Sequence, residues 1–147
     1  MNNVEEFYLD NGLRVFLKED KFSPVSSIFV WVNTGSAYEN DFERGLAHVH
    51  EHMIFKGTEK LKVGEISKQI EAHGGEVNAF TSFDETVYYT TISNSFIDVG
   101  FDILSDCMSN ATFNEDELAK ELEVIIEEIK RGEDSPSSCL GEMIFKN

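Results

Sequence analysis

Three of the four histidines of the chain lie in one short segment, Gly45-Leu-Ala-His-Val-His-Glu-His-Met53. Each residue of an α-helix turns about 100°, so His48 and His52 are one turn apart on a single face. Glu51 lies about 60° from His48 around the helix axis, on the side away from His52, so all three share one face. His50 points roughly the opposite way. We therefore predict a helix that presents two imidazoles and one carboxylate together.

Two imidazoles four residues apart on a helix are spaced to bind one divalent metal ion. A carboxylate beside them can act on a water molecule bound to that metal. This H-x-x-E-H order is the reverse of the commoner H-E-x-x-H helix of zinc hydrolases. The alternative is a solvent-facing helix that is merely rich in histidine. A third ligand and a suitable fold would decide against that alternative.

A later helix, predicted from about Asn114 onward, offers the third ligand. Asn114 is the expected N-cap of this helix. The apolar positions that follow at helical spacing are Leu118, Leu122, Ile125 and Ile129. Glu121 and Glu128 border this stripe on one flank, two turns apart, where a carboxylate can reach a neighbouring helix. Helical phase leaves both glutamates open, with Glu117 as a weaker third candidate.

The remaining segments predict an α+β fold, in which helices pack mainly on one face of an antiparallel sheet. Asp10-Asn-Gly12 between two apolar runs indicates a tight hairpin. Strands are expected at residues 25–32, 77–82 and 86–92, and we expect the first to be buried on both faces near its end. The last two strands should form an antiparallel pair. Further helices are expected at residues 63–73 and 95–109.

Composition is typical of one soluble domain, since 147 residues can form a sizeable core. A formal charge of −16 argues against nucleic acid as a partner and permits a basic peptide. We expect no membrane span, because no apolar run is long enough, and the polar, acidic start is unlike a targeting peptide. Cys107 and Cys139 lack metal-ligand spacing and are interpreted as free thiols. We therefore expect a cytoplasmic location.

The C-terminal segment predicts one more helix, with Pro136 at its first position. Its apolar stripe begins with Leu140, Met143 and Ile144, and the sequence stops at Asn147 without a cap. We interpret residues 1–147 as a single domain that is cut off within its last helix. An uncovered stripe of this kind is an association site, so we expect a homodimer that buries this helix.

Three collinear motifs resemble the inverzincin metallopeptidases, the relatives of pitrilysin, insulin-degrading enzyme and the β-subunit of the mitochondrial processing peptidase. The first motif is Gly45-Leu-Ala-His-x-x-Glu-His-Met-x-Phe-x-Gly-Thr58. The second is Gly74-Gly-x-x-Asn-Ala-x-Thr81, followed by Thr86-x-Tyr-Tyr89. The third is Glu121-Leu-Glu-Val-Ile-Ile-Glu-Glu128. The similarity runs from the first strand to about residue 131.

The resemblance implies a site with one Zn²⁺ ion per chain. It makes His48, His52 and Glu128 the zinc ligands and Glu51 the general base. Glu121 becomes a catalytic-site carboxylate behind the ligands. Only the resemblance, and not helical phase, selects Glu128 over Glu121.

The resemblance also implies that Asn78, Ala79 and Thr81 lie on the strand where a peptide substrate docks. A free strand edge can take an extended peptide by strand addition, with little preference for its sequence. The alternative is an internal strand, because strand order cannot be read from one sequence.

Members of this family are built from two homologous halves or subunits, and the second supplies an arginine and a tyrosine that hold the peptide and the oxyanion. The chain resembles most of a first half. One hypothesis is therefore a zinc-dependent endopeptidase that hydrolyses short or unfolded peptides with a metal-activated water and Glu51 as base. The other is a non-catalytic metal-binding subunit that needs a homologous second half or chain. In either case we expect the chain alone to be a poor peptidase.

Overall fold

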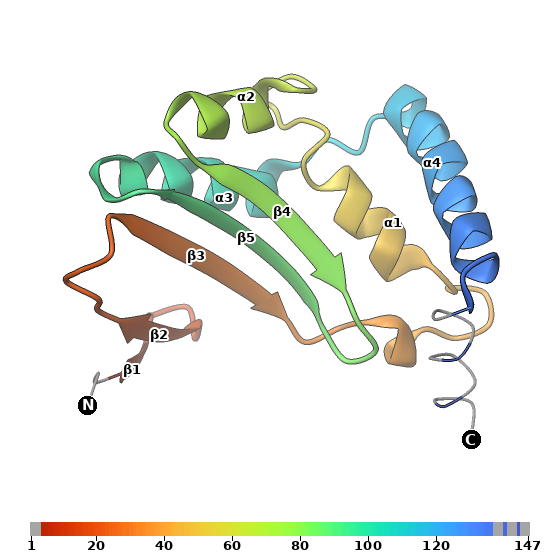
Figure 1. Cartoon of the computed structure of the whole chain (residues 1–147), viewed down its shortest axis with the longest axis horizontal. Helices are drawn as coiled ribbons and strands as arrows, with labels where there is room; N and C mark the ends of the chain where they lie inside the picture. The colour runs from red at the N-terminus through yellow and green to blue at the C-terminus, as the bar shows by residue number, and fades with distance from the viewer. Residues whose placement is uncertain (1–3, 137–139, 141–143, 145–147) are drawn as a thin grey trace.

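The computed structural model describes residues 4–136 together with residues 140 and 144. In chain order the elements are β1 (Val4–Tyr8), β2 (Arg14–Lys18), β3 (Val25–Val32), the short 3-10 helix η1 (Ser36–Tyr38), α1 (Leu46–Met53), α2 (Glu65–Ala72), β4 (Glu76–Thr81), β5 (Thr86–Ser93), the 3-10 helix η2 (Asn94–Phe96), α3 (Ile97–Asn110) and α4 (Glu115–Glu133). Figure 1 shows their arrangement. Helices and strands alternate along the chain only in part, which is typical of α+β proteins.

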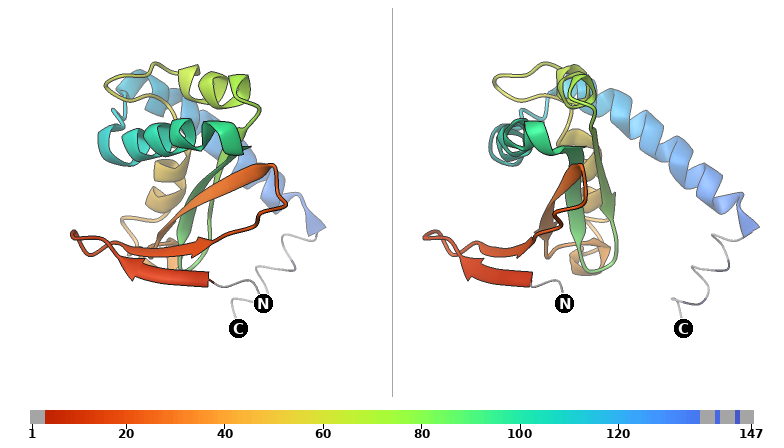
Figure 2. Two further views of the ribbon diagram at one scale, coloured as in Figure 1. Left: turned by 90° about the vertical axis from the view of Figure 1, so that its left-hand side faces the viewer. Right: turned by 60° about the vertical axis from the view of Figure 1, so that its left-hand side comes forward.

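The main sheet has three antiparallel strands in the order β3-β5-β4, so β5 is central and β4 lies at one edge. The predicted antiparallel pair is therefore confirmed as β4 and β5. The β1–β2 hairpin forms a separate two-stranded sheet and extends away from the main sheet (Figure 2). Its turn contains Gly12 at φ +85°, a conformation that favours glycine.

Helices cover one face of the main sheet, as the sequence predicts. The buried core between them consists of Ile54, Ile66, Ile70, Tyr88, Ile92, Ile103, Leu104 and Cys107. The two buried residues of α2, Ile66 and Ile70, are four positions apart and so lie on one face of the helix. Burying these side chains packs α3 on β5 and α2 on β4 and α3. Pairing with β5 in turn sets the position of β4.

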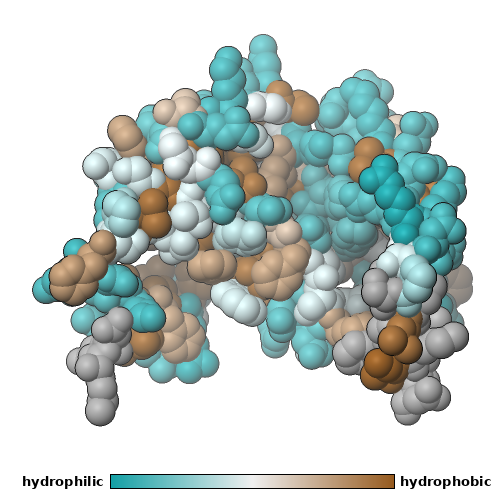
Figure 3. Space-filling view, viewed as in Figure 1, coloured by the Kyte–Doolittle hydropathy of each residue, from teal (hydrophilic) through white to brown (hydrophobic). Residues whose placement is uncertain are grey.

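The opposite face of the main sheet is uncovered in the described part of the chain, and the prediction that β3 is buried on both faces near its end is wrong. Burial along β3 alternates, leaving the side chains of Phe29 and Trp31 50% and 63% exposed. Phe29 stacks on Tyr89 at 5.2 Å and Trp31 contacts the edge of Phe80 at 6.4 Å, measured between ring centroids. Apolar and weakly polar side chains accordingly gather over the sheet in Figure 3. The sequence of β3 places large apolar residues on both faces, which is typical of a strand buried on both sides. In the structure, helices cover only one of these faces.

Helix α4 begins as predicted, with the Asn114 side chain accepting hydrogen bonds from the backbone N–H groups of Asp116 and Glu117. The predicted apolar stripe is buried only in part. Ile125 is buried, whereas Leu122 and Ile129 are exposed. The reason is that α4 packs on α1 along one narrow flank and otherwise extends away from the body of the molecule (Figure 2).

Beyond α4, the backbone is helical at Pro136, Leu140 and Ile144, and the last two are exposed. Met143 and Cys139 lie outside the described residues. The homodimer expected from this stripe stays a prediction. Among the described residues, no helix combines the length and apolar character that a membrane crossing requires.

Candidate metal centre

The histidine helix α1 is held at its N-terminus by a carboxylate from outside the helix. Glu39 accepts hydrogen bonds from the backbone N–H groups of Gly45 and Ala47, each at 2.7 Å. These two bonds satisfy donors that have no partner within the helix, and Gly45 itself is left-handed at φ +92°. At the other end Met53 is fully buried. Helix α1 is therefore fixed at both ends.

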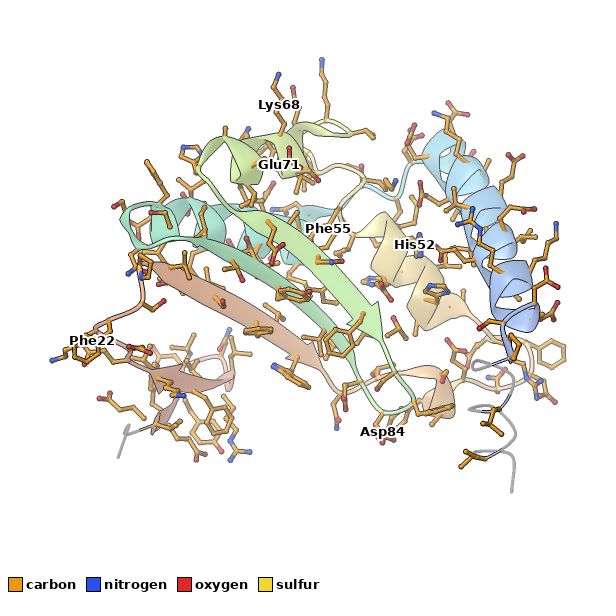
Figure 4. All side chains as sticks on the ribbon, in the orientation of Figure 1. Phe22, His52, Phe55, Lys68, Glu71 and Asp84 are labelled. Atoms are coloured by element: carbon orange, nitrogen blue, oxygen red, sulfur yellow. The ribbon has the colours of Figure 1, made fainter. Side chains whose placement is uncertain are left out.

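Three ligand atoms from α1 and α4 converge on one point. The Nε2 atoms of His48 and His52 are 3.1 Å apart, and Oε2 of Glu128 lies 3.7 Å from the first and 3.4 Å from the second. Around a tetrahedral zinc ion with bonds of about 2.0–2.1 Å, neighbouring ligand atoms are about 3.3 Å apart. The three residues thus fit a zinc ion with little movement. His52 lies between α1 and α4 in Figure 4.

The three candidate ligands differ in their exposure to solvent. The side chains of His48 and Glu128 are 36% and 45% exposed, while that of His52 is mostly buried. An ion held here would therefore have one side open to water or to a substrate, as in catalytic zinc sites rather than structural ones.

Glu121, the other glutamate that helical phase left open, lies behind His52 instead of beside the three ligand atoms. Its Oε2 is 3.1 Å from Nδ1 of His52, and its Oε1 forms an ion pair with Lys56. When Nδ1 of His52 carries the proton and donates it to Glu121, Nε2 is left with a free lone pair for a metal. Burial favours the neutral acid, yet the hydrogen bonds from Lys56 and His52 outweigh it and hold the pKa of Glu121 below its usual value.

Glu51 lies where α1 meets the end of β4. Its Oε2 accepts a hydrogen bond from the hydroxyl of Thr81 at 2.5 Å. Sequence reasoning placed Thr81 on a substrate-docking strand and missed this contact with the predicted base. The hydrogen bond between Thr81 and Glu51 cannot be predicted from local sequence spacing, because the two residues are 30 positions apart.

The strand β4 has a free edge, since it pairs with β5 alone among the described strands. The backbone N–H of Ala79 faces that edge and donates to the Asn78 side chain at 2.9 Å. Residues two apart point their backbone groups the same way, so Thr81 presents its N–H and C=O to the same edge. This edge lies on the side of α1 (Figure 1).

His50 takes no part in the cluster, as its helical phase predicts. Its Nδ1 is 2.7 Å from the hydroxyl of Tyr88, and its ring lies 5.1 Å from that of Phe113. Burial lowers the pKa of His50. Burial, followed by the charge of Glu51, raises the pKa of Tyr88 to about 12. His50 therefore joins α1 to the sheet and the segment before α4.

The sequence profile of the insulinase family, peptidase family M16, matches residues 14–147. The chain belongs to this peptidase family. Among similar insulinase-family proteins, an uncharacterized zinc protease of Bacillus subtilis, YmxG, is 36% identical over 97% of this chain and 35% of its own length. The β-subunit of the mitochondrial-processing peptidase of Bos taurus is 37% identical over 93% of this chain and 27% of its own length.

The chain is also similar to a protein of known structure, a protease from Helicobacter pylori whose crystal structure has been solved. It superimposes with a TM-score of 0.88 at 35% identity, covering 95% of this chain and 34% of that protein. The insulinase-family fold is therefore shared at the level of both sequence and structure. The chain spans about a quarter to a third of the length of the relatives it matches.

Proposed function

We propose that this chain carries the metal-binding part of a zinc-dependent endopeptidase that acts on short or unfolded peptides. The observation that carries this proposal is the triangle of His48, His52 and Glu128, whose edges of 3.1–3.7 Å suit one zinc ion. Glu51, one residue before a ligand on the same helix, is available as a base. A purely structural zinc site has no need of such a base.

The proposed chemistry is addition of water to a peptide carbonyl. When bound, zinc would polarise the carbonyl and lower the pKa of the attacking water toward 7. Glu51 would take the proton from that water as its oxygen bonds to the carbonyl carbon. As the C–N bond breaks, Glu51 would return the proton to the leaving amine. The hydrogen bond from the Thr81 hydroxyl would help to hold the Glu51 carboxylate in place for this role.

We further propose that the substrate adds as an extended strand to the free edge of β4. The N–H of Ala79 is available there once the Asn78 side chain swings away, because their bond is local and exposed. Main-chain hydrogen bonds of this kind select for extended backbone rather than for sequence. The net charge of −16 favours basic peptides, since the acidic field attracts them.

The rival proposal is a metal-binding subunit that becomes active only with a homologous second half or chain. The exposure of His48 and Glu128 favours it, because an open site neither excludes water nor stabilises the oxyanion. The relatives named above include a subunit of a processing peptidase, and they are about three to four times as long as the matched region.

Zinc titration of the metal-free chain, combined with an assay on a fluorogenic basic peptide, tests both proposals. We expect one zinc per chain, and a matched acidic peptide should be cleaved more slowly than the basic one. Slow but measurable turnover by the zinc-loaded chain alone would select the endopeptidase, whereas turnover only after a second half is added would select the subunit. A chain that takes up no zinc at micromolar concentrations would contradict both.

A further inference from the structure

Lys56 lies in a loop whose backbone is held on both sides. Its N–H donates to the carbonyl of Met53 at the end of α1, at 3.0 Å. The next residue, Gly57, has φ +121°, and its carbonyl accepts from the N–H of Thr112 at 3.1 Å. Thr58 then forms an isolated bridge with Ala111. The position of Lys56 relative to α1 and to the segment before α4 is therefore set by the fold.

From this loop the Lys56 side chain reaches Glu121 on α4, and each oxygen of that carboxylate has its own partner. Oε1 pairs with the ammonium of Lys56, and Oε2 faces Nδ1 of His52 at 3.1 Å. Glu121 is only 8% exposed. A buried carboxylate needs both a compensating charge and a full set of hydrogen bonds.

We propose that Lys56 is a positioning residue of the metal centre. By occupying Oε1, it directs Oε2 of Glu121 to the imidazole of His52. Glu121 then keeps the Nδ1 proton of His52 in place and leaves Nε2 for the metal. Lys56 also prevents Glu121 from turning a free oxygen toward the ion in competition with Glu128. This inference rests on the zinc site proposed above and assigns it a further residue.

Loss of the Lys56 charge should therefore weaken zinc binding although Lys56 touches none of the three ligand atoms. Removing a group that orients a ligand typically costs about 10–100-fold in metal affinity. We expect Lys56→Met, which keeps the length of the side chain, to lower zinc affinity about tenfold or more. Lys56→Arg keeps the charge and the donors and should remain within about threefold of the wild type.

Lys60 provides a matched control. It pairs with another buried carboxylate, Asp106, at 3.3 Å, on a part of the molecule that contains none of the candidate ligands. Lys60→Met should therefore leave zinc affinity unchanged. A general effect of losing one positive charge would instead raise the zinc affinity of both variants alike, because a more negative protein attracts Zn²⁺ more strongly.

The experiment is competition for zinc between each variant and a chromophoric chelator, with the fold checked by circular dichroism. A second measurement is the ¹⁵N spectrum of the histidines in the metal-free chain. His73 should carry its proton on Nδ1 in every variant, because this atom lies 2.7 Å from the carbonyl oxygen of Gln69. In the wild type, His52 should give a second signal with the proton on Nδ1. That signal should be altered in Lys56→Met and retained in Lys56→Arg. A merely structural role of Lys56 would leave this tautomer unchanged.

Glu121→Gln supplies a background in which Lys56→Met removes no compensating charge. If Lys56 acts through Glu121, adding Lys56→Met to Glu121→Gln should cause no further loss of zinc affinity. This comparison of the single and double variants tests the role of Lys56 even if Lys56→Met alone fails to fold. A further tenfold loss in that background, or equal affinity of the wild type and Lys56→Met, would overturn the inference. A wild type that binds no zinc would instead refute the proposed function.

Discussion

Thr81 and Glu51 are joined by a hydrogen bond of 2.5 Å between Oγ1 and Oε2, at the point where the edge strand β4 meets the histidine helix α1. The bond links the strand proposed to hold the peptide to the carboxylate proposed to act as base. A substrate that docks on β4 would thus meet a base whose position is set by the same strand.

Replacing Thr81 with Val should separate metal binding from catalysis. Val keeps the shape but removes the hydroxyl, so Glu51 loses a hydrogen bond to a charged group, worth about 1.5–3 kcal/mol. We expect zinc affinity to be unchanged and peptidase activity, measured in the complete enzyme, to fall roughly tenfold or more. Thr91→Val is the control, because the Thr91 hydroxyl bonds to Ser27 on the uncovered face of the sheet. Equal loss of activity in both variants would contradict the role of Thr81.

Glu51→Gln and His48→Ala should fail in different ways. Glu51→Gln keeps the shape and removes the base, so zinc content should survive while activity falls roughly 10²–10⁴-fold. His48→Ala removes a ligand and should lose the metal itself. Zinc content measured by mass spectrometry of metals, with activity on the same samples, compares them. If Glu51→Gln lost zinc as fully as His48→Ala, Glu51 would be a ligand.

The two glutamates of α4 should differ in their effect on zinc. Oε2 of Glu128 faces both imidazoles, whereas Glu121 contacts the far nitrogen of His52. Glu128→Gln should therefore abolish stoichiometric zinc binding at micromolar concentrations. Glu121→Gln should only weaken it, by about 10–100-fold. Chelator competition measures both, and the reverse order of effects would exchange the roles of the two residues.

The stability of the chain should depend on pH through His50. Its pKa is lowered in the folded state by burial, so the unfolded chain binds this proton more tightly. Stability from neutral His50 is fully present above the unfolded pKa of about 6.5 and is lost as pH falls through it toward the folded pKa. Urea unfolding of the metal-free wild type and His50→Gln should show the advantage of the wild type shrinking between pH 7.5 and pH 5.5. An advantage that is equal at both pH values would count against this origin.

Several features of the fold and of the site could be predicted from the sequence because they depend on neighbours within one element. The shared face of His48 and His52 follows from the pitch of a helix, and the hairpin at Gly12 follows from a turn that requires positive φ. The cap at Asn114 is likewise a local hydrogen bond. Periodicity failed where burial depends on a partner element, as at Trp31 and Ile129, whose exposure reflects which faces of β3 and α4 meet a neighbour.

The tertiary structure decided how residues from different elements combine at the site. Helical phase allowed both Glu121 and Glu128, and the crossing of α4 over α1 brings Oε2 of Glu128 to the two Nε2 atoms while Glu121 reaches Nδ1. The edge position of β4 and the contacts of Lys56 and Thr81 also emerged only there. Phase along a helix repeats every turn and cannot tell which turn meets a partner. That choice depends on where and at what angle the packed elements cross, which is set by the whole core.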